Sequence, residues 1–470
     1  MTMRTRWNGR VAHATGALAA AAVLAVSARS VAQTTPACST LAPNNPVFIS
    51  GSSASQPVLQ ALAKVLGTSV SIIYQNPDSC FGLNDAIVGQ PSTEAGIKTQ
   101  YLDPVNGATA CTLDAAPTTQ VVDIGVSDVF PATCQGNLGM GGTTAGAQME
   151  VEGPIQAMTI AVPQMSTATS INAAAANIVF GNDAMSVPVG TWTVPLAIFT
   201  RPDTSGTLNM IGTAIGLLAN RWVNATPGTT PVPTNQASST GAMFSDLAGA
   251  TNANATIGIL SDEAVIQNNA KNLLDSGTGT TVKPLAFQGA TQTCAYLPDS
   301  KLGATDRINV REGRYDIWGP LHFVTNVSNG ALTAPHAAAA AIVLNYFIAT
   351  GPNGGTPIPT ASDAGVDAGA GAVTSTAEQA LIAAEANTTI SGGGVVPWCA
   401  MEVVRTSEIG AEASYQPDIP CGCYFESIAA GATVSPYCQP CNVANGNADC
   451  NPEGGTSAYP VCRYGYCEVK

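Results

Sequence analysis

The stretch RPDTSGTLNMIGTAIGLL, from Arg201 to Leu218, places an arginine and three small residues directly before an apolar segment with helical spacing. A helix begins with unpaired backbone N–H groups and carries about half a positive charge at that end. Ser205 and Thr207 add hydroxyls there, and Gly206 lets the backbone approach a ligand closely. Arg201 can give two parallel hydrogen bonds to an oxyanion. The stretch therefore predicts an anion site, with an ordinary helix cap and a surface Arg–Asp pair as the alternative.

The same chemistry recurs at two earlier points of the chain. SGSSASQPVLQALAKVL sets Ser55 and the backbone N–H of Gln56 where a helix begins, and YQNPDSCFGLNDAI does the same with Ser79 and Gly82. Each stretch begins with or follows a predicted strand. Loops at the carboxyl ends of parallel strands can converge on one small anion. Three unrelated helix caps are the alternative interpretation.

An acidic residue follows the next predicted strand. DIGVSDVFP places Asp128 at the same expected edge of the sheet. An ionised aspartate only accepts hydrogen bonds. Asp128 would therefore accept from phosphate, which keeps a proton at neutral pH, and would face a second acceptor if sulfate, which keeps none, entered. A simple cap of the following turn is the alternative.

Short apolar runs alternate with helical patterns from Val47 onward. This alternation predicts an α/β fold with parallel or mixed sheets and helices on both faces. Three polar stretches, at 90–119, 224–240 and 351–371, interrupt the pattern and are predicted insertions, the last of them of low complexity. The strand candidates are PVFIS, VSIIYQ, VVDIGVSD, IQAMTIAVP, WTVPLAIFT, TIGILSDEAVI, VKPLAFQ, PLHFVTNV and GVVPWCAMEVV.

The first 32 residues have the pattern of an export signal. Basic residues including Arg4 and Arg6 precede an apolar run that is too short to span a bilayer, and cleavage is expected near Gln33. This segment holds four of the 17 basic residues and none of the 31 acidic ones, so the net charge without it is −18. Such an acidic chain is not a nucleic-acid binder. We expect export to the periplasm or the cell surface.

The cysteines are distributed unevenly. Seven of the 13 lie in residues 421–470, where aliphatic residues are few. In an exported chain this predicts a small module held by disulfides, with a zinc or calcium site as the alternatives for this segment. The odd total leaves one thiol free or paired between molecules, and the sequence cannot assign the pairs.

Four of these stretches, GSSASQP, YQNPDSCFG, GVSDVFP and RPDTSGT, resemble the periplasmic phosphate-binding proteins of ABC phosphate importers (PstS-like) and occur in the same order. ATIGILSDEAVIQNN and GGGVVPW are similar to later parts of that family. The resemblance covers residues 45–350 and 390–405. It implies two α/β lobes that close on phosphate about a hinge. The implied phosphate contacts are Ser55, the Gln56 backbone, Ser79, Asp128, Arg201, Ser205, Gly206 and Thr207.

The resemblance also implies how the chain is divided. It implies a first part of lobe 1 at 45–153, lobe 2 at 154–288 and a return to lobe 1 at 289–405, followed by the cysteine-rich module. The implied partners are inorganic phosphate and an ABC permease of the inner membrane, for a monomer without cofactor or metal. The second loop departs from the family because Asp78, Cys80 and Phe81 replace glycines.

Enzymatic function is not expected. Only His322 and His336 follow the signal, and no G-x-S-x-G or H-E-x-x-H motif occurs. The second function class is a cell-surface, adhesion or structural protein that retains the binding-protein fold without phosphate transport. The cysteine-rich module and the acidic, Thr/Asn-rich composition favour it.

Overall fold

The computed structural model describes residues 35–42, 44–93, 97–113, 121–138, 147–181, 189–223, 235–276, 281–329, 331–352, 375–387, 393–429, 434–451 and 457–469. The predicted export signal and most of the predicted insertions at 224–240 and 351–371 lie outside these residues. In the described chain, no helix is both long and apolar enough to cross a membrane.

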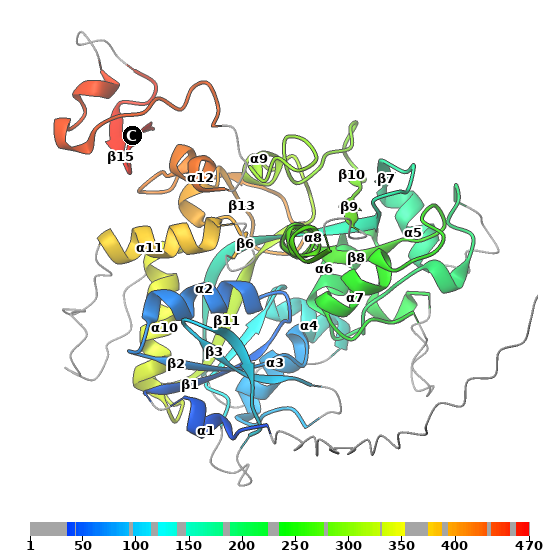
Figure 1. The fold of residues 1–470 in the computed structure, drawn as a ribbon, viewed down its shortest axis with the longest axis horizontal. Helices are drawn as coiled ribbons and strands as arrows, with labels where there is room; N and C mark the ends of the chain where they lie inside the picture. The colour runs from blue at the N-terminus through cyan, green and yellow to red at the C-terminus, as the bar shows by residue number, and fades with distance from the viewer. Residues whose placement is uncertain are drawn as a thin grey trace, which may run out of the picture. The chain divides into compact units, whose positions relative to one another are not determined.

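A ten-stranded mixed sheet forms the centre of the fold (Figure 1), in the order β4-β3-β2-β1-β5-β11-β6-β8, with β12 added to β11 and β9 to β6. This architecture confirms the predicted α/β class with mixed sheets. The strands are β1 Pro46–Gly51, β2 Ser71–Gln75, β3 Thr99–Asp103, β4 Gly107–Ala110, β5 Ile124–Ser127, β6 Ala147–Pro163, β7 Ser170–Asn172, β8 Gly258–Ser261, β9 Val282–Pro284, β10 Ala286–Gln288, β11 Trp318–Ser328, β12 Ala331–Leu332, β13 Val403–Val404, β14 Ala413–Ser414, β15 Val461–Arg463 and β16 Tyr466–Glu468.

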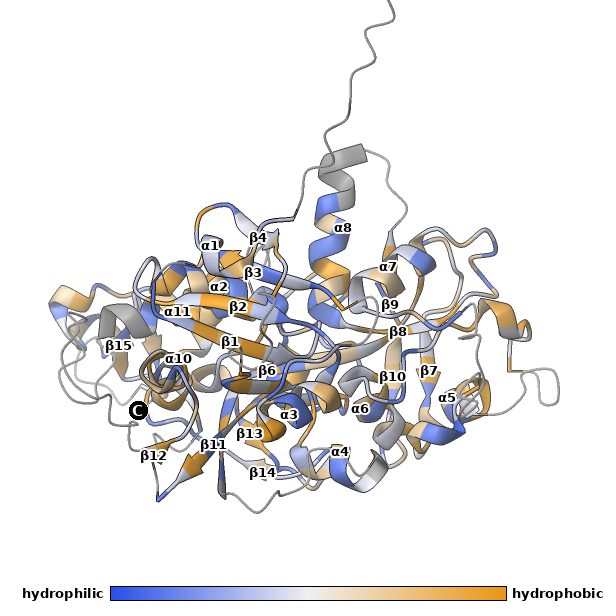
Figure 2. Ribbon diagram, turned by 90° about the horizontal axis from the view of Figure 1, so that it is seen from below, coloured by the Kyte–Doolittle hydropathy of each residue, from blue (hydrophilic) through white to orange (hydrophobic). Residues whose placement is uncertain are grey.

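Helices cover both faces of the sheet. Apolar side chains of α2, α10 and α11, such as Leu62, Leu344 and Leu381, share one core with Ile49 of β1, whereas α3 packs on the opposite face (Figure 2). The helices are α1 Cys38–Leu41, α2 Gln56–Leu66, α3 Ser79–Val88, α4 Pro131–Leu138, α5 Ala173–Gly181, α6 Gly206–Ile215, α7 Thr240–Ala248, α8 Asp262–Ser276, α9 Ile308–Arg311, α10 Ala337–Thr350, α11 Ser375–Ala386 and α12 Gly422–Ile428.

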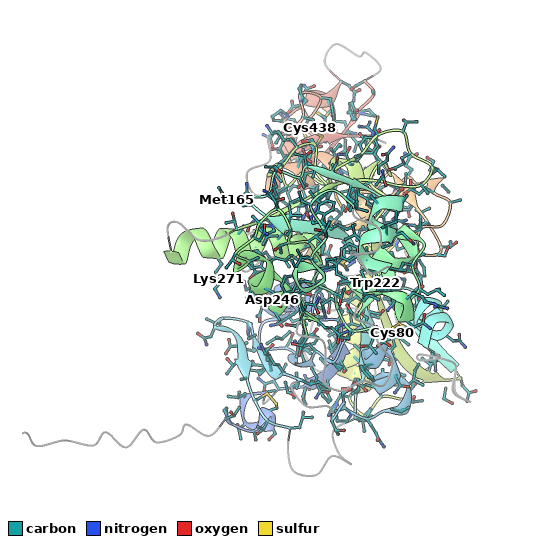
Figure 3. All side chains as sticks on the ribbon, turned by 90° about the vertical axis from the view of Figure 1, so that its right-hand side faces the viewer. Cys80, Met165, Trp222, Asp246, Lys271 and Cys438 are labelled. Carbon is teal, nitrogen blue, oxygen red and sulfur yellow. A yellow bond between two sulfur atoms is a disulfide. The ribbon has the colours of Figure 1, made fainter. Side chains whose placement is uncertain are left out.

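A second, larger core surrounds the carboxyl half of β6. Ile160 of that strand packs with apolar residues of α5, α6 and α7. Phe180 and Trp222 are part of this core, with ring centroids 5.1 Å apart. Figure 3 looks onto this side of the molecule, where Asp246 and Lys271 lie at the surface. The division into two lobes stays a prediction.

Two strand predictions were wrong. WTVPLAIFT forms a 3-10 turn, Pro195–Ala197, followed by two isolated bridges, because a proline cannot donate to a strand ladder. GVVPWCAMEVV likewise forms a 3-10 turn, Trp398–Ala400, before the short β13. The predicted insertion at 90–119 contributes β3 and β4, an antiparallel hairpin that extends the sheet.

The cysteine-rich segment is held by disulfides, as predicted. Of the five cysteines whose spacing suggested a zinc site, four are paired as Cys441–Cys462 and Cys450–Cys467, and Cys438 is bridged to a cysteine outside this set. Each bridged sulfur is part of a covalent S–S bond and is not available as a thiolate ligand, so the zinc alternative is wrong for these residues. The remaining pairs are Cys38–Cys111, Cys80–Cys134, Cys399–Cys421 and Cys423–Cys438.

The odd cysteine is Cys294, which is exposed and free. The segment proposed as a calcium alternative uses Asp449 to cap its own turn, because this carboxylate accepts from the Asn442 N–H at 2.8 Å. A buried ion pair of 2.9 Å between Arg311 and Glu426 joins α9 to α12 at the start of this region.

Candidate functional site

Three strand ends meet at one edge of the sheet. β1 pairs in parallel with β2 on one side and with β5 on the other, so their carboxyl ends face the same way. The loop after β1 leads to Ser55, the loop after β2 to Asp78 and Ser79, and β5 leads to Asp128. The loop before α6, which carries Arg201, lies against the loop after β2.

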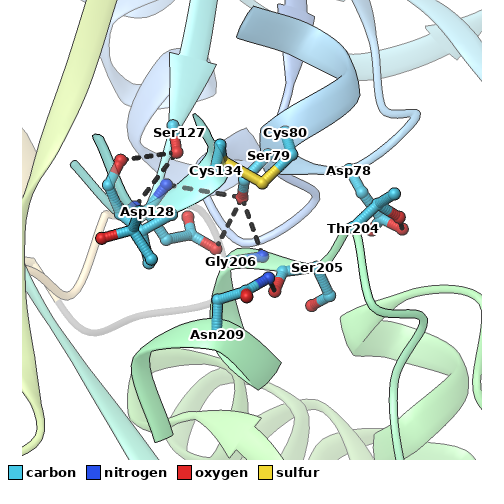
Figure 4. The surroundings of a disulfide bond; sticks show 12 residues. Asp78, Ser79, Cys80, Ser127, Asp128, Cys134, Thr204, Ser205, Gly206 and Asn209 are labelled. Carbon is cyan, nitrogen blue, oxygen red and sulfur yellow. Dashed lines mark hydrogen bonds between the residues drawn. A yellow bond between two sulfur atoms is a disulfide. The ribbon is translucent and has the colours of Figure 1, made fainter. Parts of the chain in front are cut away.

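Ser79 connects two of these loops to α6. Its Oγ lies 3.3 Å from Asp128 Oδ2, to which it donates (Figure 4). The same oxygen accepts from the Gly206 N–H at 3.2 Å and from the Asp128 N–H at 3.4 Å. A serine hydroxyl has one donor and two acceptor positions. The structure thus brings Ser79, Asp128 and Gly206 into direct contact. The Ser79 hydroxyl accepts from the first backbone N–H of α6, that of Gly206.

Gly206 is required for this close approach. A Cβ at residue 206 would lie 2.4 Å from Ser79 Oγ and 2.9 Å from Asp128 Cβ. We therefore expect Gly206→Ala to lower the free energy of unfolding by about 1–3 kcal/mol in urea denaturation, because α6 must move away. Gly241→Ala is the matched control, since a Cβ in this α7 position has no neighbour within 4 Å. Equal losses in the two variants would contradict the packing argument.

Arg201 is buried and already paired. Its side chain is 2% exposed, and its Nη2 lies 2.7 Å from Asp78 Oδ1. Its Nη1 donates to Thr240 Oγ1 at 3.2 Å. Its Nε is buried and has no hydrogen-bond partner among the described residues. The guanidinium is therefore neutralised by a carboxylate of the chain itself, which the sequence analysis did not foresee.

Asp78 accepts a second hydrogen bond across the same junction. The hydroxyl of Thr204 donates to Asp78 Oδ2 at 3.1 Å. The backbone of Asp78 has φ 114° and ψ 164°, a conformation that only glycine adopts without strain. Aspartate replaces a glycine of the resembled family at position 78. As a consequence, a strained aspartate is ion-paired with Arg201, the cation of the predicted anion site.

Asp128 lies in the same cluster and is 2% exposed. Burial raises the pKa of its carboxyl group to about 6, while the hydroxyls of Ser52 and Ser79 and the Arg201 guanidinium limit the rise. Oδ1 of Asp128 is buried without a hydrogen-bond partner in the described chain. The site therefore holds a carboxylate with one unused acceptor atom.

Ser55 lies at the border of the cluster. Its hydroxyl donates to the Ser52 carbonyl at 2.8 Å and lies 3.5 Å from Tyr74 Oη. Burial raises the pKa of Tyr74, and the charges of Asp128 and Asp78 add to this rise. Ser55 is thus near the site but bonded within its own loop.

The other predicted residues are distributed around α6 and α2. Ser205 and Thr207 are buried at the start of α6, and the Ser205 side chain makes no capping hydrogen bond. Gln56 is half-buried and lines a cleft of about 430 Å³ between α2, α7 and α8. Ser53 and Thr240 line the same cleft, and their hydroxyls are 3.1 Å apart. The Thr240 hydroxyl also accepts from Arg201, so the cleft lies next to the cluster.

Cys80 holds one side of the site in place. Its disulfide to Cys134 joins α3 to α4 beside Ser79 (Figure 4). Its N–H donates to the Thr204 carbonyl at 3.2 Å, which adds a backbone contact between the two loops. Thr204 and Thr240 carried no sequence signal beyond their position near a helix start.

No known family model matches the chain, and no curated protein matches it. The fold is similar to solved structures of phosphate-binding proteins. An ABC-type phosphate transport receptor from Vibrio cholerae is 14% identical, covers 63% of this chain and 92% of its own, and has a TM-score of 0.35. PstS from Borrelia burgdorferi is 13% identical, with 66% and 94% covered and a TM-score of 0.29.

A high affinity periplasmic phosphate-binding protein (PfluDING), solved with bound phosphate, is 15% identical and has a TM-score of 0.42. The match covers 67% of this chain and 91% of that one. At this distance the likeness concerns the fold alone.

Proposed function

We propose that this chain is an exported solute-binding protein that takes one hydrogen phosphate ion between the loops that lead into α3 and α6. One observation carries the proposal. The buried cluster contains an acceptor, Asp128 Oδ1, and a donor, Arg201 Nε, that have no partners in the described chain. Buried polar groups are nearly always paired. Hydrogen phosphate has both an O–H group and free acceptor oxygens, so one ion can satisfy the two atoms together.

The neighbouring groups support an anion as the guest. The Gly206 N–H belongs to the first turn of α6, and the Ser79 hydroxyl now occupies it at 3.2 Å. A helix start of this kind stabilises an oxyanion. Ser205 and Thr207 supply further hydroxyls at the same turn. These groups suit binding and release of an oxyanion.

Binding is proposed in preference to catalysis. Both histidines of the described chain are bonded to carboxylates outside the cluster, His322 to Glu150 at 2.6 Å and His336 to Asp123 at 2.9 Å. Neither histidine is placed to activate Ser79 as a nucleophile. Export is supported by the six disulfides. Delivery of the ligand by the monomer to an ABC permease of the inner membrane is the cellular role that would follow.

A second candidate is favoured by the ion pair. Because Asp78 neutralises Arg201, the buried guanidinium needs no external anion to balance its charge. A cell-surface or structural protein that retains the fold would keep such a pair and bind no phosphate.

Calorimetric titration of the purified mature chain with inorganic phosphate separates the two candidates. The binding-protein proposal expects a one-to-one complex with micromolar or tighter affinity, and sulfate at the same concentration is the control. A titration without heat up to millimolar phosphate would leave the structural role as the better account.

A further inference from the structure

We propose that Asp78 is a built-in competitor of the bound anion: its carboxylate takes the place of a ligand on Arg201 and must leave before an external oxyanion can bind. The inference rests on the proposed phosphate site and adds a residue that sets its affinity. The ion pair between Asp78 and Arg201 would thus make the site self-inhibited.

The carboxylate of Asp78 makes the contacts that an oxyanion would make. Asp78 Oδ1 accepts from the Arg201 guanidinium at 2.7 Å, and Asp78 Oδ2 accepts from the Thr204 hydroxyl at 3.1 Å. Both side chains of the ion pair are more than nine-tenths buried. A charged hydrogen bond in such surroundings is strong, so a second anion cannot share the guanidinium at no cost.

The charges of the cluster lead to the same conclusion. The described cluster contains two carboxylates, Asp78 and Asp128, and one guanidinium, that of Arg201, which is paired with Asp78. The negative charge of Asp78 also adds to the raised pKa of Asp128. A dianion that entered while both carboxylates stayed in place would face an excess of negative charge. Withdrawal of Asp78 removes one of these charges and frees the cation.

The backbone of Asp78 is strained in the paired state. Its φ of 114° lies in a region that a residue with a Cβ adopts only when its surroundings enforce it. The contacts that hold this residue include the two side-chain bonds and the Gly82 N–H, which donates to the Asp78 carbonyl at 2.9 Å. Nearby, the Cys80 N–H donates to the Thr204 carbonyl at 3.2 Å. Loss of the Arg201 bond would relax the strain, which offsets part of the cost of breaking the ion pair.

The competitor can be removed without altering the ligand groups. Asp78→Asn keeps the shape and removes the charge, and Asp78→Gly also removes the backbone strain. Asp203→Asn is the matched control, because it deletes one carboxylate of the same loop as Arg201 but an exposed one. We expect both Asp78 variants to bind inorganic phosphate at least about tenfold more tightly than the wild-type chain in calorimetry, and the control to be unchanged.

Thermal unfolding provides a second measurement. Without phosphate, Asp78→Asn should melt below the wild type because a buried guanidinium loses its partner. Added phosphate should raise its Tm by more than it raises the wild-type Tm. If the aspartate variants fold poorly, Thr204→Val is the alternative. It keeps the charges of Asp78 and Arg201 and removes only the hydrogen bond from Thr204 to Asp78, so we expect it to raise phosphate affinity by a smaller factor.

The outcomes distinguish this inference from the proposed function. Phosphate binding that is equally strong in wild type and in the Asp78 variants would overturn the competitor and leave the phosphate site standing. If the Asp78 variants bound phosphate and the wild-type chain did not, the result would support Asp78 as a competitor and show that the wild-type site is self-inhibited. No binding by any variant, folded as judged by its melting curve, would overturn both.

Discussion

Arg201→Ala is expected to lower phosphate affinity at least tenfold, a loss of about 1.4 kcal/mol or more of binding free energy, because one partner of a buried charged contact is removed. The reason is that Arg201 is the single guanidinium that the described site offers to an anion, at 2% exposure. The measurement is a calorimetric phosphate titration at neutral pH. Arg314→Ala is the control, because that arginine forms an exposed pair with Glu312.

The alanine variant also leaves Asp78 buried without its cation. The double variant Arg201→Ala/Asp78→Asn removes this complication, and we expect it to recover stability but not phosphate affinity. If phosphate bound to the single and the double variant as it binds to the wild type, the site would have to lie elsewhere in the molecule.

The sequence could predict the positions of the site residues but not their pairing. Serines at helix starts and the order of strands and helices are local patterns, and they placed Ser79 and Gly206 at the first residues of α3 and α6, with Arg201 in the loop before α6. The bond between Asp78 and Arg201 joins residues 123 positions apart. Nothing in the local sequence specifies which carboxylate reaches the guanidinium, although Asp78 stands where the resembled family has glycine.

The failed strand predictions have a common cause. WTVPLAIFT and GVVPWCAMEVV are apolar enough to be strands, but each contains a proline near its centre. Apolar character reports burial, whereas a strand also needs a free N–H at each paired position. Pro195 and Pro397 stand at or next to the 3-10 turns that interrupt these segments. The hairpin of β3 and β4 was missed for the opposite reason, since its polar side chains lie at a half-exposed sheet edge.

Asp128→Asn is expected to reduce the preference for phosphate over sulfate by about 10- to 100-fold. In this variant sulfate would gain a hydrogen bond at residue 128 that the aspartate cannot give it. In the wild type an ionised Asp128 presents only acceptors, so sulfate leaves two acceptors facing each other, whereas hydrogen phosphate donates its proton. The asparagine amide supplies an N–H to either anion. Competition calorimetry with sulfate at pH 8 measures the change, and Asp203→Asn, an exposed carboxylate of the Arg201 loop, is the control.

Protonation of Asp128 at acidic pH should have the same effect on sulfate binding as the Asp128→Asn substitution. Because burial raises the pKa of Asp128 to about 6, the carboxyl group is ionised at pH 8 and mostly protonated at pH 5. A protonated Asp128 is a donor, so sulfate should begin to compete for the wild-type site as the pH falls through about 6. In Asp128→Asn the residue has no proton to gain, and its sulfate competition should change little over that range. Sulfate rejection that is the same in both proteins at both pH values would remove Asp128 as the origin of selectivity.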